Sequence, residues 1–324
     1  MEKEKILDKY YNSQHRYHTA KHVDQLLSLV PFHTETDLDR DILSKAVMFH
    51  DSVYDPRAND NEERSCEEFK KCFPGYATTD QVCSCIMATK DHVLGKGKLE
   101  DALITLDLHI FSMGMTALMA YEDGIFNEYQ FVPIDEYITK RLDVLVNLTA
   151  KMSLSNRFTH QTLENMNVLQ EYVRSRKYLV GIYPGSFNPF HIGHLNIVNQ
   201  AETVCSKVVI AQGINPDKAN SVLDIFSRRP MPSCLRNEIV TYTGLVTDLF
   251  KSQYENVKLV LVRGLRSVYD LGYEDNLRRV VKDIRPDINF MYFFCDPGLE
   301  HISSSQIRNL SKFNRKLADR YLVP

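Results

Sequence analysis

The stretch Tyr183-Pro-Gly-Ser-Phe-Asn-Pro-Phe-His-Ile-Gly-His194 decides the fold of the second half of this chain. A short apolar run at residues 178–183 leads into it, and a run with helical spacing at residues 195–204 follows it. A strand, a glycine-rich turn and a helix in this order direct backbone N–H groups toward a phosphate. The two histidines at the helix entry add ring donors. We therefore predict a phosphate-binding turn, with a surface turn carrying two incidental histidines as the alternative.

Strands and helices alternate on both sides of this turn. The expected strands are residues 178–183, 207–212, 256–263 and 288–294, and the expected helices follow Gly193 and cover about 271–282 and 305–313. Nearly continuous apolar strands between helices are typical of a parallel sheet that is covered on both faces. We predict a Rossmann-like α/β domain over residues 176–324.

Three further polar motifs lie where such a sheet places its ligands, in loops after strand ends. They are Asn215-Pro-Asp-Lys218, Arg263-Gly-Leu-Arg266 and His301-Ile-Ser-Ser-Ser-Gln-Ile-Arg308. Each supplies cations, hydroxyls or helix N-terminal amides, and none supplies an obvious nucleophile or general base. Nucleotidyl transfer needs only reactants held in line and charge stabilised on phosphate oxygens. The dinucleotide-binding spacing and the GxxxxGK[ST] motif of kinases are both missing from the sequence.

These motifs resemble the HxGH nucleotidyltransferase superfamily and, within it, phosphopantetheine adenylyltransferase, over about residues 178–324. The resemblance implies that ATP and 4′-phosphopantetheine become dephospho-CoA and pyrophosphate, with Mg²⁺ assisting. It implies catalytic roles for His194, Lys218 and Arg263, and an acceptor site formed by Ser186, Lys218, Val246 and Arg263. It implies an ATP site formed by Ser186, Phe187, His194, Gly264, Leu265, Arg266, Glu274, Leu299, Ser303, Ser304 and Ser305.

Three features depart from that family. Asn188 stands where the family usually has aspartate, and Phe190-His191 is similar to the nicotinate or nicotinamide mononucleotide adenylyltransferases. Residues 219–236 contain Pro230 and Pro232, which would break the amphipathic helix that the family has there. Adenylyl transfer to nicotinamide or nicotinate mononucleotide is therefore the alternative function.

The first half, residues 1–175, reads as an all-α domain, so we predict a multidomain chain. Apolar residues repeat at three and four over about 23–30, 39–49, 62–73, 79–90, 99–112, 115–129, 134–151 and 161–175. His15, His18 and His22 gather at the start of one expected helix, with His18 and His22 on one face. His50-Asp51 ends an apolar helix, and Asp107 interrupts an apolar run. Imidazoles and carboxylates from three helices suit a divalent metal that activates water.

The pattern of His22, His50-Asp51 and Asp107 resembles the HD superfamily of metal-dependent phosphohydrolases. The flanking segments 17–22, 49–55, 60–65 and 88–92 resemble a small HD family of unassigned substrate. The resemblance implies that His22, His50, Asp51 and Asp107 bind a divalent transition metal such as Mn, Fe, Co or Ni. His18 is the alternative to His22 as first ligand. His92 could support a ligand, bind a second metal or end a solvated helix, and the whole half could instead be a non-catalytic nucleotide-binding regulatory module.

Composition sets the wider expectations. The chain has 324 residues, of which 25% are charged and 44% hydrophobic, and a formal net charge of −3. These values describe an ordinary soluble protein and give no reason to expect a nucleic-acid partner. Seven cysteines without a CxxC pair, and no uninterrupted apolar run of membrane-spanning length, favour a cytoplasmic protein without a membrane partner. The adenylyltransferase resemblance implies a homo-oligomer.

Overall fold

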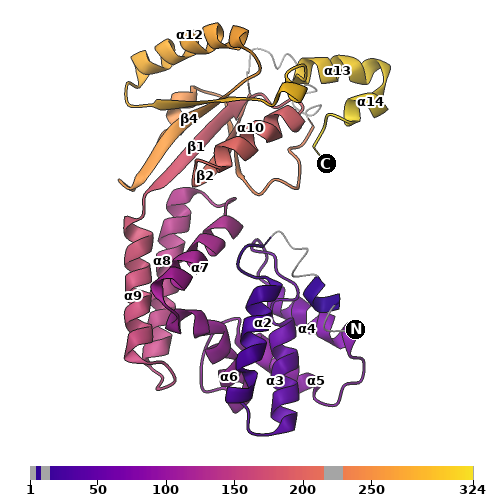
Figure 1. Ribbon diagram of the computed structural model, residues 1–324, viewed down its shortest axis with the longest axis vertical. Coiled ribbons are helices and arrows are strands. Elements are labelled where there is room, and N and C mark those ends of the chain that lie inside the picture. The colour runs from indigo at the N-terminus through magenta and orange to yellow at the C-terminus, as the bar shows by residue number, and fades with distance from the viewer. Residues whose placement is uncertain (1–4, 9–14, 215–228, 324) are drawn as a thin grey trace. The chain divides into compact units, whose positions relative to one another are not determined.

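The computed structural model describes residues 5–8, 15–214 and 229–323. The chain forms two compact units, one of Met1–Tyr129 with Ile138–Arg174 and one of Gln130–Tyr137 with Ser175–Pro324. The expected helical region followed by a parallel-sheet α/β region is confirmed (Figure 1). Within the described residues no single helix is long and apolar enough to cross a membrane, and only the bent pair Lys98–Ser112 and Met115–Glu128 passes that test jointly.

The helical half is built from helices of about one to five turns. They are α2 (Ala20–Leu29), η1 (Val30–Phe32), α3 (Asp37–Phe49), α4 (Asn61–Cys72), α5 (Thr79–Ala88), α6 (Lys98–Asp107), η2 (Leu108–Ser112), α7 (Met115–Glu128), α8 (Ile134–Ser153) and α9 (His160–Ser175). In α3 the buried residues Ile42, Leu43, Ala46 and Val47 form one apolar stripe. Thr36 caps that helix by accepting a hydrogen bond from the backbone N–H of Asp39 at 3.0 Å.

One local expectation was wrong. Helix α2 begins at Ala20, after Thr19 in extended backbone, so His18 lies before the helix and does not share a helical face with His22. The physical reason is the buried carboxylate of Glu128, which accepts the backbone N–H groups of Arg16, Tyr17 and His18 at 2.7–3.1 Å. Donors that are satisfied by a distant side chain do not need a helical turn.

The second unit contains a five-stranded parallel sheet of order β3-β2-β1-β4-β5. Its strands are β1 (Tyr178–Gly185), β2 (Lys207–Gly213), β3 (Glu238–Tyr242), β4 (Val257–Leu265) and β5 (Asn289–Phe294). Its helical elements are α10 (Ile192–Glu202), η4 (Val246–Leu249), α12 (Val268–Ile284), η5 (Pro297–Leu299), α13 (Ser304–Phe313) and α14 (Arg315–Asp319). Strand β3 was not expected, because this edge strand has only five residues and includes Glu238 and Thr241.

Alternation along the strands covers both faces of the sheet. Tyr183, Val260 and Val262 point to the face that packs with Ile197 and Val198 of α10. Ile182 and Leu261, one residue out of phase, point to the opposite face, where Val281 of α12 packs. Figure 1 shows α10 and α12 on opposite sides of the strands. The parallel sheet therefore brings all its strand C-termini to one edge, between the two helical layers.

A segment from the middle of the chain completes this unit. Lys207 is only 1% exposed, and its Nζ donates to the backbone oxygens of Gln130 and, at 2.9 Å, of Val132. The same Nζ forms an ion pair with Glu238 at 3.2 Å. Asp135 accepts hydrogen bonds from Ser252 Oγ at 2.6 Å and from the backbone N–H of Gln253 at 2.8 Å. Residues 130–137 are thus fixed to the α/β unit, although they precede two long helices in sequence.

Candidate functional site

The turn after β1 is tightly built. An added Cβ at Gly185 would lie 2.7 Å from the ring of Phe187, which itself has a φ of +44°. A Cβ at Gly264, at the end of β4, would lie 2.8 Å from Ile197 in α10. Glycine is needed at both positions because the neighbouring side chains occupy the space. Glycine thus lets Phe187 pack against the end of β1 and α10 pack against the end of β4, and both contacts border one hollow.

That hollow is a cavity of about 220 Å³ at the C-terminal edge of the sheet. It gathers most of the residues that the sequence assigned to nucleotide and acceptor binding. Those that line it are Phe187, His194, Arg263, Gly264, Leu265, Arg266, Leu299, Ser303 and Ser304. Tyr183 and Ile302, which lie within the predicted motifs, also line it, and so do Ile197 and Cys295, which sequence reasoning missed. Cys295 directly follows β5, so the strand-end rule that found Arg263 could have found it as well.

The two histidines of the turn line the cavity and stack on each other. Their ring centroids lie 3.6 Å apart, and the backbone N–H of His191 donates to Nδ1 of His194 at 3.3 Å. Since Nδ1 of His194 accepts, its proton resides on Nε2, which is then a donor. Burial and the cationic Arg266 lower the pKa of His191 to about 4. Burial, His191 and Arg266 hold the pKa of His194 well below its usual value. Both rings are therefore neutral at pH 7.

Arg263 is held rigidly at the cavity wall. Its Nε and Nη2 donate to the two carboxylate oxygens of Glu274 at 2.7 and 2.6 Å, and its Nη1 donates to the backbone oxygen of Pro184 at 3.3 Å. Glu274 is 4% exposed and lies behind the arginine. A two-point pair of this kind fixes the plane of the guanidinium. By contrast, Arg266 is an exposed residue paired with Asp270 at 3.3 Å.

Helix α13 is tied to the turn. Ser303 caps the helix by accepting from the backbone N–H of Gln306, and Ser304 Oγ donates to the backbone oxygen of Pro189 at 2.9 Å. Arg308 donates to the backbone oxygen of Asn188 and to Ser305 Oγ. The first and last motifs of the sequence are therefore joined, and the positive end of α13 lies beside the cavity.

The remaining assigned residues lie elsewhere. Lys218, with the rest of residues 215–228, lies outside the described residues. Ser186 is exposed at the end of β1, and Ser305 contacts Arg308 in the first turn of α13. Val246 begins η4 and packs against the apolar cluster on the α12 face of the sheet. The described residues that line the cavity do not include Ser186, Ser305, Val246 or Glu274.

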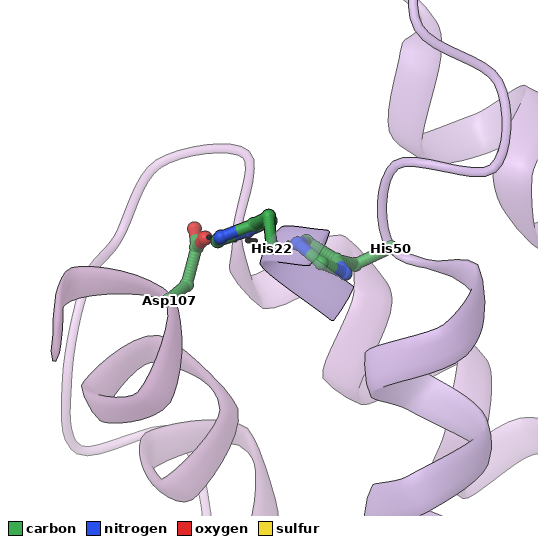
Figure 2. Close-up of side chains that lie close together, drawn as sticks. All are labelled: His22, His50 and Asp107. Atoms are coloured by element: carbon green, nitrogen blue, oxygen red, sulfur yellow. Dashed lines mark ion pairs between the residues drawn. The ribbon is translucent and has the colours of Figure 1, made fainter. Parts of the chain in front are cut away.

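A second cluster lies in the helical unit (Figure 2). His22 comes from α2, His50 directly follows α3 and Asp107 ends α6. Their ligand atoms all lie within 4.8 Å of one another. Oδ1 of Asp107 is 3.5 Å from Nε2 of His22 and 3.6 Å from Nε2 of His50. Three helix ends thus bring two imidazoles and a carboxylate to one point.

The donor set of this cluster fits a divalent cation. His22 and His50 are 6% and 1% exposed, and both Nε2 atoms are buried without a hydrogen-bond partner. Nδ1 of His50 bonds to the backbone oxygen of Val47 at 2.8 Å, so that in the neutral ring the proton lies on Nδ1 and the lone pair of Nε2 is directed at the cluster. Orphaned buried nitrogens are unfavourable unless a ligand occupies the space between them. Imidazole and carboxylate donors suit Mn, Fe, Co, Ni or Zn.

Electrostatics in the cluster favour a cation. Although burial lowers the pKa of His50, the carboxylates of Asp51 and Asp107 raise it well above its usual value. Burial raises the pKa of Asp51, but His50 and His18 lower it to about 2. Oδ2 of Asp51 lies 3.0 Å from Nε2 of His50, which is an ion-pair distance without hydrogen-bond geometry, so this carboxylate borders the three-residue group. The lowered pKa values of Asp51 and Asp107 keep both carboxylates ionised, so that their charge would stabilise a cation bound between them.

His18 has different interaction partners from His22. Its Nδ1 bonds to Oε2 of Glu128 at 2.7 Å, and its Nε2 lies 4.0 Å from Asp51. The ring of His18 also stacks on Tyr54 with centroids 3.9 Å apart. The geometry therefore groups His22, and not His18, with His50 and Asp107.

Fold and cavity together define an α/β nucleotidyltransferase, and residues 182–310 match the family described as cytidylyltransferase-like. Similar proteins of known name indicate which nucleotidyltransferases the chain resembles. The chain is 33% identical to the phosphopantetheine adenylyltransferase of Clostridium tetani (strain Massachusetts / E88) over 139 residues, which are 41% of this chain and 84% of the relative. It is 30% identical to that of Clostridium botulinum (strain Hall / ATCC 3502 / NCTC 13319 / Type A) over 148 residues, 44% of this chain and 87% of the relative. Through its C-terminal part, the chain belongs to the phosphopantetheine adenylyltransferase family.

Proposed function

We propose that the α/β unit transfers the adenylyl group of ATP to 4′-phosphopantetheine, giving dephospho-CoA and pyrophosphate. The observation that carries the proposal is that His194, Arg263, Arg266 and the N-terminus of α13 line the same cavity. The choice of 4′-phosphopantetheine as the acceptor rests on the similar proteins, which are named phosphopantetheine adenylyltransferases.

In the proposed reaction a phosphate oxygen of the acceptor attacks the α-phosphorus of ATP. The bond from that phosphorus to the bridging oxygen breaks, and pyrophosphate leaves with the electron pair. The attacking phosphate is already ionised at pH 7, so no general base is required. Nε2–H of His194 donates to an α-phosphate oxygen, and Arg263, held by Glu274, binds the acceptor phosphate.

Mg²⁺, when bound, would neutralise charge on the leaving pyrophosphate. The described residues that line the cavity include no carboxylate. We therefore propose that Mg²⁺ is bound through the triphosphate of ATP, with water as its other ligand, as is usual for this ion.

The test is a product analysis. Purified protein is mixed with ATP, Mg²⁺ and 4′-phosphopantetheine, and pyrophosphate and dephospho-CoA are measured by coupled assay and mass spectrometry. We expect both products with the wild type and neither with His194→Ala. Release of pyrophosphate with nicotinamide or nicotinate mononucleotide, but not with 4′-phosphopantetheine, would overturn the assignment of the acceptor.

We propose further that the helical unit is a metal-dependent phosphohydrolase whose metal is held by His22, His50, Asp51 and Asp107. The observation that favours this second function is the pair of buried Nε2 atoms without hydrogen-bond partners, facing the Asp107 carboxylate. The metal would supply a water of lowered pKa for attack on a phosphoester.

Metal analysis and hydrolysis test this function together. We expect the wild type to carry Mn, Fe, Co or Ni and to hydrolyse a member of a phosphoester panel, and His50→Ala to do neither. Equal, negligible metal content in both proteins would contradict the proposed metal site. Metal binding or nucleotide binding without any hydrolysis would instead indicate a non-catalytic regulatory module.

A further inference from the structure

The two oxygens of Asp107 have different neighbours. Oδ1 faces Nε2 of His22 and of His50, at 3.5 and 3.6 Å. Oδ2 accepts a hydrogen bond from Nε2 of His92 at 3.0 Å. Only Oδ1 is thus directed at the two orphaned imidazole nitrogens, while Oδ2 is already occupied by a histidine from another part of the chain.

The backbone at His92 is held in an unusual conformation. His92 has a φ of +51°, which is uncommon for a residue other than glycine, and it lies four residues after the C-terminal residue of α5. Its backbone N–H bonds to the oxygen of Ala88 at 3.2 Å. The preceding residue, Asp91, is anchored by Lys96 at 2.8 Å and by the backbone N–H of Val93 at 3.1 Å. A left-handed residue that its neighbours hold in place is often there to aim a side chain.

We propose that His92 is a positioning residue of the metal centre. By donating Nε2–H to Oδ2 of Asp107, it fixes that carboxylate so that Oδ1 points to the cation between His22 and His50. The inference rests on the metal site proposed above. Hydrogen-bonded partners of this kind orient metal ligands, and their loss typically lowers metal affinity about 10- to 100-fold.

The competing assignment makes His92 a ligand of a second cation bridged by Asp107. His92 is not part of the group of His22, His50 and Asp107, whose ligand atoms lie within 4.8 Å of one another. The two assignments differ in the number of metal ions per chain, which can be measured directly.

Three variants of the full chain separate the roles. His92→Asn tolerates the left-handed backbone better than histidine but has a side chain too short to reach Oδ2. His92→Gln places an amide N–H where Nε2–H was. His160→Ala removes a histidine that is 86% exposed on α9, away from the cluster, and serves as the control.

Metal-free protein is titrated with Co²⁺, and binding is followed by the visible spectrum of the bound ion and by metal content per chain. The wild type and His160→Ala should bind one Co²⁺. His92→Asn should bind it about 10- to 100-fold more weakly with an altered spectrum, and His92→Gln should recover most of the affinity. The thermal midpoint of metal-free His92→Asn should not fall, because asparagine favours the left-handed region.

Unchanged affinity of His92→Asn would overturn the inference, and so would a fall in its metal-free thermal midpoint that accompanies the loss of affinity. Two Co²⁺ per wild-type chain and one per His92→Asn chain would make His92 a ligand instead. If the wild type and His50→Ala both bind no Co²⁺, the proposed metal site itself fails, and the role of His92 fails with it.

Discussion

The protonation state of His191 and His194 is set by their surroundings in the folded protein. Both rings are buried beside Arg266, and the pKa of His191 is lowered from 6.5 to about 4. A histidine with a depressed pKa in the folded state favours folding above pH 6.5, and this contribution is lost as the pH falls toward 4. The neutral rings can donate hydrogen bonds without carrying charge.

We expect His191 to titrate near pH 4 in an NMR titration, with its resonance assigned through His191→Asn. The stability of the second unit to urea should fall by up to about 3 kcal/mol between pH 7 and pH 4, and this fall should be smaller in His191→Asn. A midpoint near 6.5 for His191 would show that the ring is solvated and would contradict this expectation.

Glu274 is the residue that sets the plane of Arg263. We expect Glu274→Gln to lower kcat/KM for 4′-phosphopantetheine on the order of 100-fold, mainly through KM, because the guanidinium is no longer held at two points. Steady-state kinetics at saturating ATP measures this.

The matched control is Asp275→Asn, on the next residue of the same helix. Asp275 pairs with Arg278 and Arg279 on the partly exposed side of α12, so its loss should leave both kinetic constants close to wild type. Equal kinetics of Glu274→Gln and wild type would mean that Arg263 is positioned by other contacts.

At the scale of elements, the sheet edge and α13 act together. The helix is fixed to the turn after β1 by Ser304 and Arg308, which bond to the backbone oxygens of Pro189 and Asn188. The helix N-terminus is then held beside the cavity without being part of the sheet.

We expect Arg308→Ala to raise KM for ATP about tenfold, because a charge-assisted hydrogen bond to the turn is lost and α13 is less firmly held. The control is Lys312→Ala, an exposed residue one turn further along α13, which should leave KM unchanged. Measured KM values that move equally in both variants would indicate a general effect of surface charge.

At the scale of the whole molecule, the chain crosses between units more than once. Residues 130–137 pack with the α/β unit and then continue into α8, most of which belongs to the helical unit. Buried Lys207 is the centre of this attachment, since it binds two backbone oxygens of that segment as well as Glu238.

We expect Lys207→Met to destabilise the second unit by about 3 kcal/mol, because buried acceptors and Glu238 lose their cationic partner. Urea unfolding of the full chain, followed by the loss of adenylyl transfer, measures the change. Lys258→Met, at an exposed position of β4, should change stability by less than about 0.5 kcal/mol. Similar losses in the two variants would refute a special role for Lys207.

Much of the fold is determined locally, and for that reason it could be predicted. Helical spacing in residues 23–30 and 39–49, and apolar runs at 178–183 and 256–263, depend only on neighbours in the chain. The position of Arg263 and Ser303 at one cavity followed from a general rule, because parallel strands end at the same edge of the sheet. The short, partly polar edge strand Glu238–Tyr242 lacked such a signal and was missed.

By itself, then, the sequence determined a helical region, a parallel α/β unit and a strand-end site with the Gly185–His194 turn at its centre. Only the tertiary structure decided which side chains meet across long separations in the chain. Glu128 removes His18 from α2, Glu274 holds Arg263, and His92 takes the second oxygen of Asp107. These pairings depend on the packing of helices and loops, which brings one partner's polar atoms within about 3 Å of the other's. No local pattern of residues encodes that distance.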